Sequence, residues 1–461
     1  MTGSFGGAAL GDLEGTGQLD IVVGSWDGKL YAWRPDGTTV PGWPVDAADI
    51  PPADIPSFGT ATHDPKLVDT PTLVDINGDG VPDVLIGLQD TVQGSSVVNY
   101  VTAFSSSGQL LPGFPLQLFA IAQSYGTATD FVTIGVQTPA ALTLPSGPTA
   151  VASPEFFLNY MIPLASPDLA FTESTGAFPE DGSPIIRFTS SPSIGNLLGT
   201  ATPQVVDAGS SVFDILAALQ SAPGQGTKLR SAVSVSDPVT GANIPQYTQE
   251  LQGLAFFSAP AIADVTGDGN PDILLSADSA ALHGFDGTTG AIASGWPKWT
   301  GGWSLATPAV GDLNGDGTVD VAVTTREGFL HVFTTPGLTS ANHEAWHWHQ
   351  NDRNTGHYGD DTRPPSAISD LHVSFGGATD TLSFTAVGDD WKSGTAASYQ
   401  VFASSKPITQ SNVGSAKQIA VSTVPQASGS HEMISVAHVK GAKHYAVRAI
   451  DHVGNIGPLP Y

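Results

Sequence analysis

Four stretches of the sequence place oxygen-bearing side chains at positions 1, 3, 5 and 9 of a nine-residue loop. In the second of them, the expected ligands are Asp75, Asn77, Asp79, Asp83 and the backbone carbonyl of Val81. Ca²⁺ takes roughly six to eight oxygen ligands in a flexible shell, so a short acidic loop can turn several of them onto one point. Gly80 follows the third side chain and permits the positive φ that folds such a loop. The spacing therefore predicts calcium binding.

Two further loops match this pattern closely, and one matches it less well. The close matches predict the ligands Asp264, Thr266, Asp268, Asn270 and Asp272, and Asp312, Asn314, Asp316, Thr318 and Asp320. The weaker match predicts Asp12, Glu14, Thr16 and Asp20, where a hydroxyl replaces the central carboxylate. We expect weaker calcium binding there. Carboxylates this close together repel one another without a cation, so calcium is expected to contribute to folding stability.

The alternative interpretation is that an Asp-Gly-rich nonapeptide is only a polar turn. Three near-perfect copies between similar apolar runs favour the metal site. We expect the ions to be structural rather than catalytic, because an all-oxygen cage with a nearly filled shell leaves little room for a substrate. No catalytic residue is assigned.

The segment His343–His347 matches the HExxH pattern of zinc proteases. That chemistry requires both histidines on one face of a helix. However, Trp346 follows its acidic loop at about the distance that separates Trp43 and Trp296 from theirs, so we predict a strand here, on the outside of the last repeat. Carboxylates such as Glu173, Glu180 and Asp181 could form a glycosidase pair, but solvated loop residues are the preferred interpretation.

Each acidic loop lies between two short apolar runs, and a second hairpin with an aromatic residue follows. Three units close with Gly-aromatic-Pro, at Trp43, Phe114 and Trp296. Units of four strands that cannot bury both faces alone stack around an axis as the blades of a β-propeller. Residues 192–206 keep the strands without the carboxylates, so this unit should fold without metal.

Five units are visible, and the gap between the loops at Asp75 and at Asn196 leaves room for a sixth, eroded one. We therefore predict an all-β fold, a propeller of about six to seven four-stranded blades. The stretches 116–190 and 210–255 are expected to carry insertions.

The loops and their flanking strands resemble the FG-GAP or VCBS-type repeats of integrin alpha-subunit propellers and of secreted bacterial proteins, over residues 8 to about 360. The resemblance implies a calcium-stabilised propeller of about seven blades. It also implies loops opposite the metal face that are available for protein or glycan recognition.

The repeat stops at the stiff break Asp361–Pro365. About seven short alternating strands follow, which is the size of a β-sandwich. Residues 366–461 are similar to a fibronectin type III domain. We predict two domains, a propeller over 1–360 and a sandwich over 361–461.

The composition favours a cation as partner. The 461 residues carry 16 Lys and Arg against 43 Asp and Glu, a formal charge of −27, which repels nucleic acid and anionic membrane. Apolar runs long enough for membrane insertion are absent from the sequence. Met1–Gly7 show no secretion signal, so we expect a fragment of a longer extracellular or cell-surface protein, where calcium is abundant.

These observations predict a calcium-binding recognition or adhesion module for an extracellular protein or carbohydrate ligand. The alternative is a polysaccharide lyase or hydrolase, or the accessory region of a secreted enzyme whose catalytic domain lies elsewhere.

Overall fold

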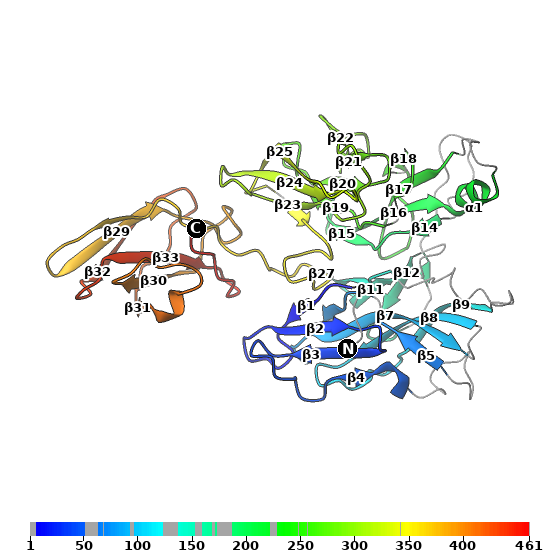
Figure 1. The fold of residues 1–461 in the computed structure, drawn as a ribbon, viewed down its shortest axis with the longest axis horizontal. Helices are drawn as coiled ribbons and strands as arrows, with labels where there is room; N and C mark the ends of the chain where they lie inside the picture. The colour runs from blue at the N-terminus through cyan, green and yellow to red at the C-terminus, as the bar shows by residue number, and fades with distance from the viewer. Residues whose placement is uncertain are drawn as a thin grey trace. The chain divides into compact units, whose positions relative to one another are not determined.

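The structure is a computed structural model (Figure 1). It describes residues 6–50, 63–67, 69–92, 96–122, 137–152, 159–167, 171–172, 187–221, 228–247, 249–255, 257–341 and 343–460. The chain forms two compact units. The first comprises residues 1–311, 320–335 and 342–360, and the second comprises 312–319, 336–341 and 361–461.

The first three blades are built of antiparallel strands and follow one another along the chain. Blade 1 contains β1 (Ala9–Gly11), β2 (Asp20–Gly24), β3 (Lys29–Trp33) and β4 (Val45–Asp46). Blade 2 contains β5 (His63–Lys66), β6 (Thr72–Val74), β7 (Asp83–Val92), β8 (Ser96–Phe104) and β9 (Leu116–Ala122). Blade 3 contains β10 (Ala140–Leu144), β11 (Gly147–Ala152), β12 (Tyr160–Pro163) and β13 (Phe171–Thr172). Blade 3 is the eroded unit that the sequence predicts between the loops at Asp75 and Asn196.

Three further sheets complete this series. Blade 4 contains β14 (Arg187–Thr189), β15 (Ser193–Gly195), β16 (Gln204–Ser211), β17 (Arg230–Ser236) and β18 (Gln249–Gln252). Blade 5 contains β19 (Ala261–Ala263), β20 (Asp272–Ser276), β21 (Ala281–Phe285) and β22 (Lys298–Trp299). Blade 6 has three strands among the described residues, β23 (Ala309–Gly311), β24 (Thr318–Thr324) and β25 (Leu330–Leu338).

The hydrophobic cores lie between neighbouring blades. One core joins residues of blades 1 and 2, the next joins blades 2 and 3, and two more join blades 3 with 4 and 4 with 5. The short strands β1, β6, β10, β15, β19 and β23 contact one another in that order. Gly195 on β15 shows how tight this contact is, because an added Cβ would lie 2.9 Å from Ile262 Cδ1. Six sheets stacked face to face around their inner strands form a β-propeller.

The stretches that were predicted to be insertions mostly hold blade strands. Residues 116–190 contain all of blade 3, and residues 210–255 contain β17 and β18. Among the described residues of these stretches, the helix α1 (Val212–Gln220) is inserted between β16 and β17. Ser211 caps it by accepting the N–H of Asp214, as a helix N-terminus requires. Among the described residues no helix is long and apolar enough to cross a membrane.

Residues 343–358, which we call the central segment, contact the inner strand of all six blades. The segment begins with β26 (His343–Ala345), which pairs with β19, and ends with β27 (His357–Tyr358), which pairs in parallel with β10. Between them, the Trp346 carbonyl accepts the N–H of Val310 on β23, and the Gln350 side chain bonds both the N–H and the carbonyl of Ile194 on β15.

The last part of the central segment forms backbone hydrogen bonds with blades 1, 2 and 3 in turn. The carbonyls of Arg353, Thr355 and Gly356 accept the N–H groups of Leu10, Leu73 and Ala141. The prediction that residues around Trp346 form the outer strand of the last blade is therefore wrong. The spacing from the loop to the tryptophan resembles that of other blades, but the backbone hydrogen bonds of β26 are made with an inner strand.

The second unit contains two three-stranded antiparallel sheets. One has the order β28 (His372–Ser374), β29 (Thr379–Thr385) and β32 (His431–Ala437), and the other β31 (Lys417–Ile419), β30 (Ser398–Ser404) and β33 (His444–Ile450). Alternate residues of both sheets share one core, in which Phe384 and Tyr399 meet edge to face at 5.2 Å between ring centroids. This arrangement is a β-sandwich.

Candidate metal centres in the blade loops

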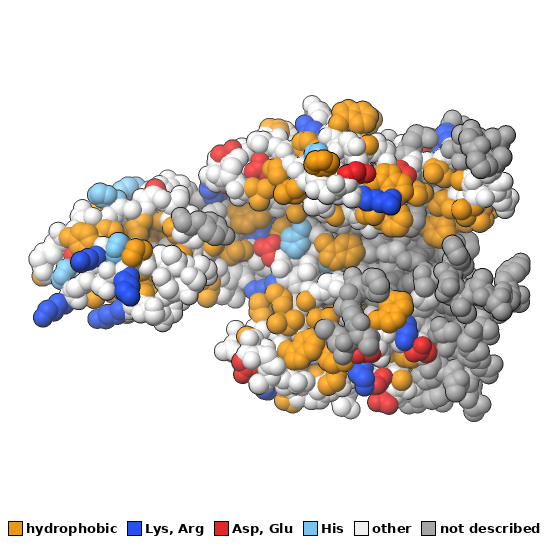
Figure 2. Space-filling model, viewed as in Figure 1, with side chains coloured by type: hydrophobic (Ala, Val, Ile, Leu, Met, Phe, Trp, Pro, Cys, Tyr) orange, Lys and Arg blue, Asp and Glu red, His pale blue; other side chains and the backbone are white. Residues whose placement is uncertain are grey.

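The nine-residue loops occupy the same place in their blades. Each joins the inner strand to the second strand, as between β6 and β7 or between β19 and β20. Blade 3 has a tight turn without carboxylates at this place, from Leu144 to Gly147. On the face shown in Figure 2, acidic side chains are scattered and do not form one patch. The candidate metal chemistry is therefore local to each loop.

The first carboxylate of the loop 75–83 is held by the loop's own backbone. Asp75 Oδ1 accepts the N–H of Gly78 at 2.7 Å, and its Oδ2 accepts the N–H of Gly80 at 3.0 Å. Gly78 and Gly80 have φ values of 79° and 88°, which residues other than glycine rarely adopt. A glycine at position 6 after ligands at 1, 3 and 5 is also how EF-hand loops turn around calcium.

The ninth residue, Asp83, is buried at the start of β7. Its Oδ2 accepts the N–H groups of Ile76 and Asn77, at 3.0 and 3.1 Å. Burial raises the pKa of Asp83 despite these bonds, and the charge of Asp79 adds to the rise. A nearby cation would oppose both effects, because it favours the ionised form.

The loop 264–272 repeats this geometry. Asp264 accepts the N–H groups of Gly267 and Gly269, and Asp272 accepts those of Val265 and Thr266, at 2.7 to 3.1 Å. Burial raises the pKa of Asp272 to about 6, with further contributions from the charges of Asp264 and Asp268. Thr266 Oγ1, a predicted ligand, is buried and makes no hydrogen bond to the described residues.

The loop 312–320 has the same hydrogen bonds at its first carboxylate. Asp312 accepts the N–H groups of Gly315 and Gly317, at 2.7 and 2.9 Å. Asp316 Oδ1 accepts the hydroxyl and the N–H of Thr318, which lowers the pKa of Asp316. Asn314 Oδ1 accepts the N–H of Asp316 at 2.8 Å.

The loop 12–20 differs from the other three at its third position. Asp12 still accepts two backbone N–H groups, from Thr16 and Gly17, and Asp20 accepts that of Leu13. Glu14, however, forms a bidentate ion pair with Arg34, with both N–O distances at 2.7 Å. The guanidinium would therefore compete with a metal ion for this predicted ligand. The nine-residue spacing does not reveal this ion pair.

The uncharged loop 196–204 is an internal comparison for the acidic loops. Gln204 stands at its ninth position, and its Oε1 accepts the N–H of Leu198 at 3.2 Å. Its Nε2 donates to Thr200 Oγ1 at 3.1 Å and to the Thr202 carbonyl at 2.7 Å. These two oxygens stand at positions 5 and 7. In the acidic loops the same positions carry predicted metal ligands. The ninth residue there is an aspartate, whose side chain has no N–H to donate.

The acidic loops therefore fit a calcium ion in their donor set. Their side chains are all oxygen donors, and the orphaned Thr266 Oγ1 lies where a ligand is expected. Within the described ranges, however, no three Asp, Glu or His side chains are already gathered at metal-ligand distances. The hydroxyl, amide and carbonyl oxygens would have to supply part of the shell.

The zinc-protease interpretation of His343–His347 does not fit the structure. Residues 343–345 form the strand β26, so the two histidines do not share a helix face. His347 Nε2 lies 2.9 Å from Asp352 Oδ1, which also accepts the indole N–H of Trp346. Glu173, Glu180 and Asp181 lie outside the described residues.

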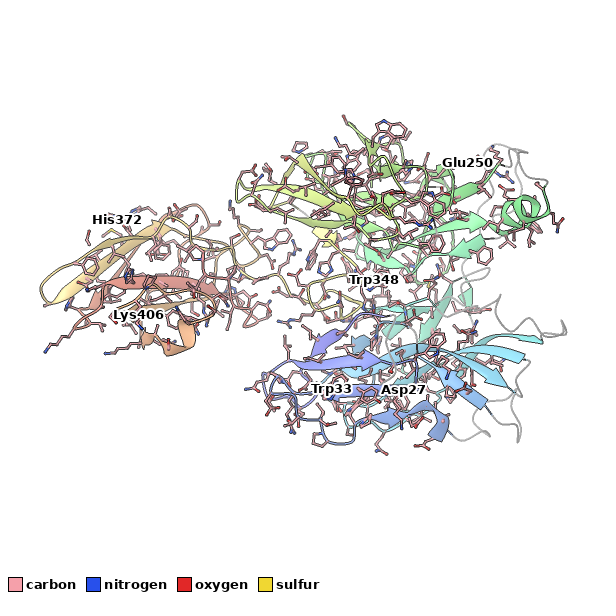
Figure 3. The ribbon with its side chains drawn as sticks, viewed as in Figure 1. Asp27, Trp33, Glu250, Trp348, His372 and Lys406 are labelled. Carbon is pink, nitrogen blue, oxygen red and sulfur yellow. The ribbon has the colours of Figure 1, made fainter. Side chains whose placement is uncertain are left out.

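A pocket of about 280 Å³ lies between blades 4 and 5. Its lining includes Glu250, on β18 at the edge of blade 4 (Figure 3), together with Leu251, Ser279, His283 and Phe285. Ser279 Oγ lies 2.8 Å from His283 Nε2, and burial lowers the pKa of His283. Ser279 and His283 stand in no recognisable motif, so the sequence does not point to this pair.

The comparisons with known proteins agree with the repeat. The FG-GAP-like repeat family matches residues 12–86 and 264–323, so the chain contains repeats of this kind. No curated protein matches the sequence.

Similar solved structures include a complex of BBS1N with ARL6DN, at 12% identity and a TM-score of 0.38, covering 82% of this chain and 87% of that chain. Another is the quinohemoprotein alcohol dehydrogenase ADHIIG from Pseudomonas putida HK5, at 14% identity and a TM-score of 0.33, covering 76% and 68%. A third is Chaetomium thermophilum Raptor, at 9% identity and a TM-score of 0.31, covering 81% and 26%. TM-scores this low do not establish a fold. The propeller architecture is therefore inferred from the sheets described above.

Proposed function

We propose that this chain is a calcium-stabilised propeller that serves as a recognition or adhesion module outside the cell. One observation supports the proposal that the acidic loops bind calcium. In the uncharged loop, the amide of Gln204 donates to the oxygens at positions 5 and 7. In the loops 75–83, 264–272 and 312–320, an aspartate replaces that amide, so a cation is the natural group to attract the same oxygens.

Calcium suits these loops better than the other common divalent ions. The donors are carboxylate, amide, hydroxyl and carbonyl oxygens, without thiolates, since the chain has no cysteine. Mg²⁺ demands a near-octahedral shell and keeps several waters, whereas Ca²⁺ accepts irregular shells. Extracellular calcium is high enough to fill sites of modest affinity, which agrees with the proposed location.

The decisive experiment is thermal unfolding of the full chain in EDTA and in excess calcium, with magnesium and zinc as controls. A site filled at 100 times its Kd contributes about 2.7 kcal/mol. We expect a calcium-specific rise of the midpoint that is smaller in the double variant Asp79→Asn, Asp316→Asn. The matched control is Asp237→Asn, an aspartate that caps an ordinary turn through the N–H groups of Val239 and Thr240. Equal midpoints of the wild type in EDTA and calcium would refute the proposal.

The ligand that we propose for the recognition module is an extracellular protein or carbohydrate. The propeller supports it because such folds present loops and interblade pockets on a rigid frame. The C-terminal sandwich, which we propose to be of the fibronectin type III kind, would space or dock the propeller. Binding to arrays of glycans and of extracellular matrix proteins should depend on calcium, and the absence of binding in both conditions would contradict a recognition role.

The pocket between blades 4 and 5 favours one alternative, a hydrolase. A serine hydroxyl against a histidine nitrogen is the first half of a nucleophilic pair, and Glu250 lines the same pocket. Glu250 Oε1, however, forms an ion pair with Lys228 Nζ at 3.1 Å. This ion pair competes with an interaction between the Glu250 carboxylate and His283. Hydrolysis of polysaccharides or simple esters that is lost in both Ser279→Ala and His283→Asn would support the enzyme and overturn the purely recognising role.

A further inference from the structure

The pocket between blades 4 and 5 lies on the outer side of the propeller. One wall is β18, the outermost strand of blade 4, and the other is formed by β21, the turn before it and the segment after it. Leu251 and Phe285 are buried and give the pocket an apolar lining, whereas Ile292, which also lines it, is 64% exposed. The pocket is therefore apolar inside and open to solvent.

The strand register places a tryptophan on the same face of blade 5. Ala281 on β21 pairs with Trp299 on β22, and Phe285 pairs with Ile292. Paired residues share a face, and so do residues two positions apart on a strand, so Trp299 lies on the face of His283 and Phe285. Phe285 belongs to the core that blades 4 and 5 share, so this face is the one directed toward blade 4.

Trp299 is 74% exposed, which is unusual for a tryptophan. A large aromatic side chain left in water beside an apolar pocket is typical of a ligand-binding surface. The neighbouring Trp296, by contrast, is buried against Gly284, where an added Cβ would lie 2.5 Å from the indole. Trp296 thus packs within blade 5, whereas the ring of Trp299 is accessible to a ligand.

The polar groups of the pocket can both donate and accept hydrogen bonds. Burial lowers the pKa of His283, so its ring is neutral near pH 7 and has one donor and one acceptor nitrogen. Ser279 Oγ lies 2.8 Å from His283 Nε2, and a hydroxyl has further hydrogen-bonding positions beyond this one contact. The amide of Gln249 adds two N–H donors and an acceptor oxygen.

The charge and size of the pocket favour a small uncharged ligand. Glu250 is paired with Lys228, and among the described residues that line the pocket there is no Lys or Arg. The formal charge of −27 disfavours an anion further. The volume of about 280 Å³ is just below the range of roughly 300–1,000 Å³ for drug-sized ligands, so a single ring fits best.

We infer that this pocket binds one neutral pyranose ring of a carbohydrate. The apolar C–H face of the sugar stacks on Trp299, because the face of an indole is negative and attracts such groups. The sugar hydroxyls, which both donate and accept, bond to Ser279, His283 and Gln249. The site depends on the recognition role proposed above and gives that role a location and a class of ligand.

Binding of small sugars to the full chain tests the site. The probes are the methyl glycosides of galactose, glucose, mannose and N-acetylglucosamine, with galacturonic acid as the anionic comparison, followed by saturation-transfer difference NMR. We expect at least one neutral glycoside to bind with a Kd of about 1 mM, since a single ring offers few atoms for contact. Oligosaccharides that end in the same sugar distinguish the end of a glycan from a free monosaccharide, because only the former is bound with a second ring attached.

Variants of the exposed tryptophan separate stacking from other contacts. Trp299→Ala should weaken binding of that sugar about tenfold or more, whereas Trp299→Phe, which keeps an aromatic face, should retain most of the affinity. Ser279→Ala should weaken it about threefold or more, because one hydrogen bond is lost. The matched control is Phe329→Ala, which removes an aromatic side chain that is 64% exposed just before β25 and should bind like the wild type.

Two results would overturn the inference. The first is sugar binding that is unchanged in Trp299→Ala and Ser279→Ala, which would leave the recognition role intact but assign it to another place. The second is the absence of sugar binding while an extracellular protein binds and is lost in Trp299→Ala, which would make the ligand a protein. If neither class of ligand binds in calcium, the recognition role itself fails. The calcium-dependent rise of the unfolding midpoint should be the same in all these variants, because it depends on the blade loops.

Discussion

At the scale of single residues, the chemistry of each loop depends on what stands at its ninth position. An aspartate there accepts backbone N–H groups and its side chain donates nothing to the oxygens at positions 5 and 7, which are the ligands that we propose for a cation. A glutamine accepts one N–H and donates to both of those oxygens. The same backbone turn thus exists in a charged and in an uncharged version. They differ by the two hydrogen bonds that the glutamine amide donates and an aspartate cannot.

We predict that Gln204→Ala destabilises the propeller by roughly 2 kcal/mol, because it leaves the Leu198 N–H without its partner and removes the bonds that the amide donates to Thr200 Oγ1 and the Thr202 carbonyl. The loss should be the same in EDTA and in calcium, since this loop has no carboxylates. Urea unfolding measures it, with the exposed Gln18→Ala as control. Partial rescue by calcium would mean that the uncharged loop binds the ion after all.

His349 predicts a pH dependence of stability. It is buried in the central segment, and burial lowers its pKa from 6.5 to about 4, although its contacts with the Pro139 and Asn354 carbonyls oppose the shift. As the pH falls from 6.5 to 4, the unfolded chain takes up a proton that the folded chain refuses, so stability decreases in this window.

His349→Asn should remove up to roughly 3 kcal/mol of that pH dependence. Asparagine suits the position because the backbone there has a positive φ, of 58°. Urea unfolding of the wild type and the variant at several pH values tests this, with the exposed His452→Asn as control. Parallel pH curves for wild type and His349→Asn would show that His349 is not the group responsible.

At the scale of elements, the central segment connects blades that are not neighbours in the propeller. Five of the six inner strands are three residues long and β10 has five, and each has an edge that the blade itself does not pair. Residues 343–358 supply partners to all six, through backbone groups and through Gln350. The segment therefore belongs to no single blade, and its deletion would leave buried N–H and carbonyl groups unpaired in each.

We predict that Gln350→Ala costs about 2 to 3 kcal/mol of unfolding free energy, since two buried backbone groups of Ile194 lose their partners. The matched control is Gln246→Ala, whose amide makes one long, exposed bond of 3.4 Å to the Thr288 carbonyl. Chemical denaturation followed by tryptophan fluorescence measures both. A cost for Gln350→Ala no larger than that of the control would show that the segment is not required to hold blade 4.

At the scale of the whole molecule, the formal charge of −27 opposes compact folding. Calcium bound in the loops would reduce this charge, so the stabilities conferred by calcium and by salt should be linked. We predict that raising NaCl from about 10 mM to about 300 mM increases the unfolding midpoint in EDTA more than in calcium, because salt screens the repulsion that the ions otherwise remove. Differential scanning calorimetry at both salt concentrations measures this, and an equal salt effect in the two conditions would contradict it.

The sequence by itself determined the repeat, the strand-loop-strand context of each acidic loop, the all-β class and the sixth blade. These features depend on local periodicity and on glycines at fixed positions, which any short window of the chain reveals. It also determined which side chains offer oxygen at positions 1, 3, 5 and 9, because a nine-residue turn is built from its own residues.

Only the tertiary structure decided where the central segment runs, because backbone pairing between residues as distant as Leu10 and Arg353 leaves no periodic trace. The same holds for the ion pair between Glu14 and Arg34. These partners come from separate segments of blade 1, and their proximity results from how its strands pair and not from a spacing that the sequence reveals.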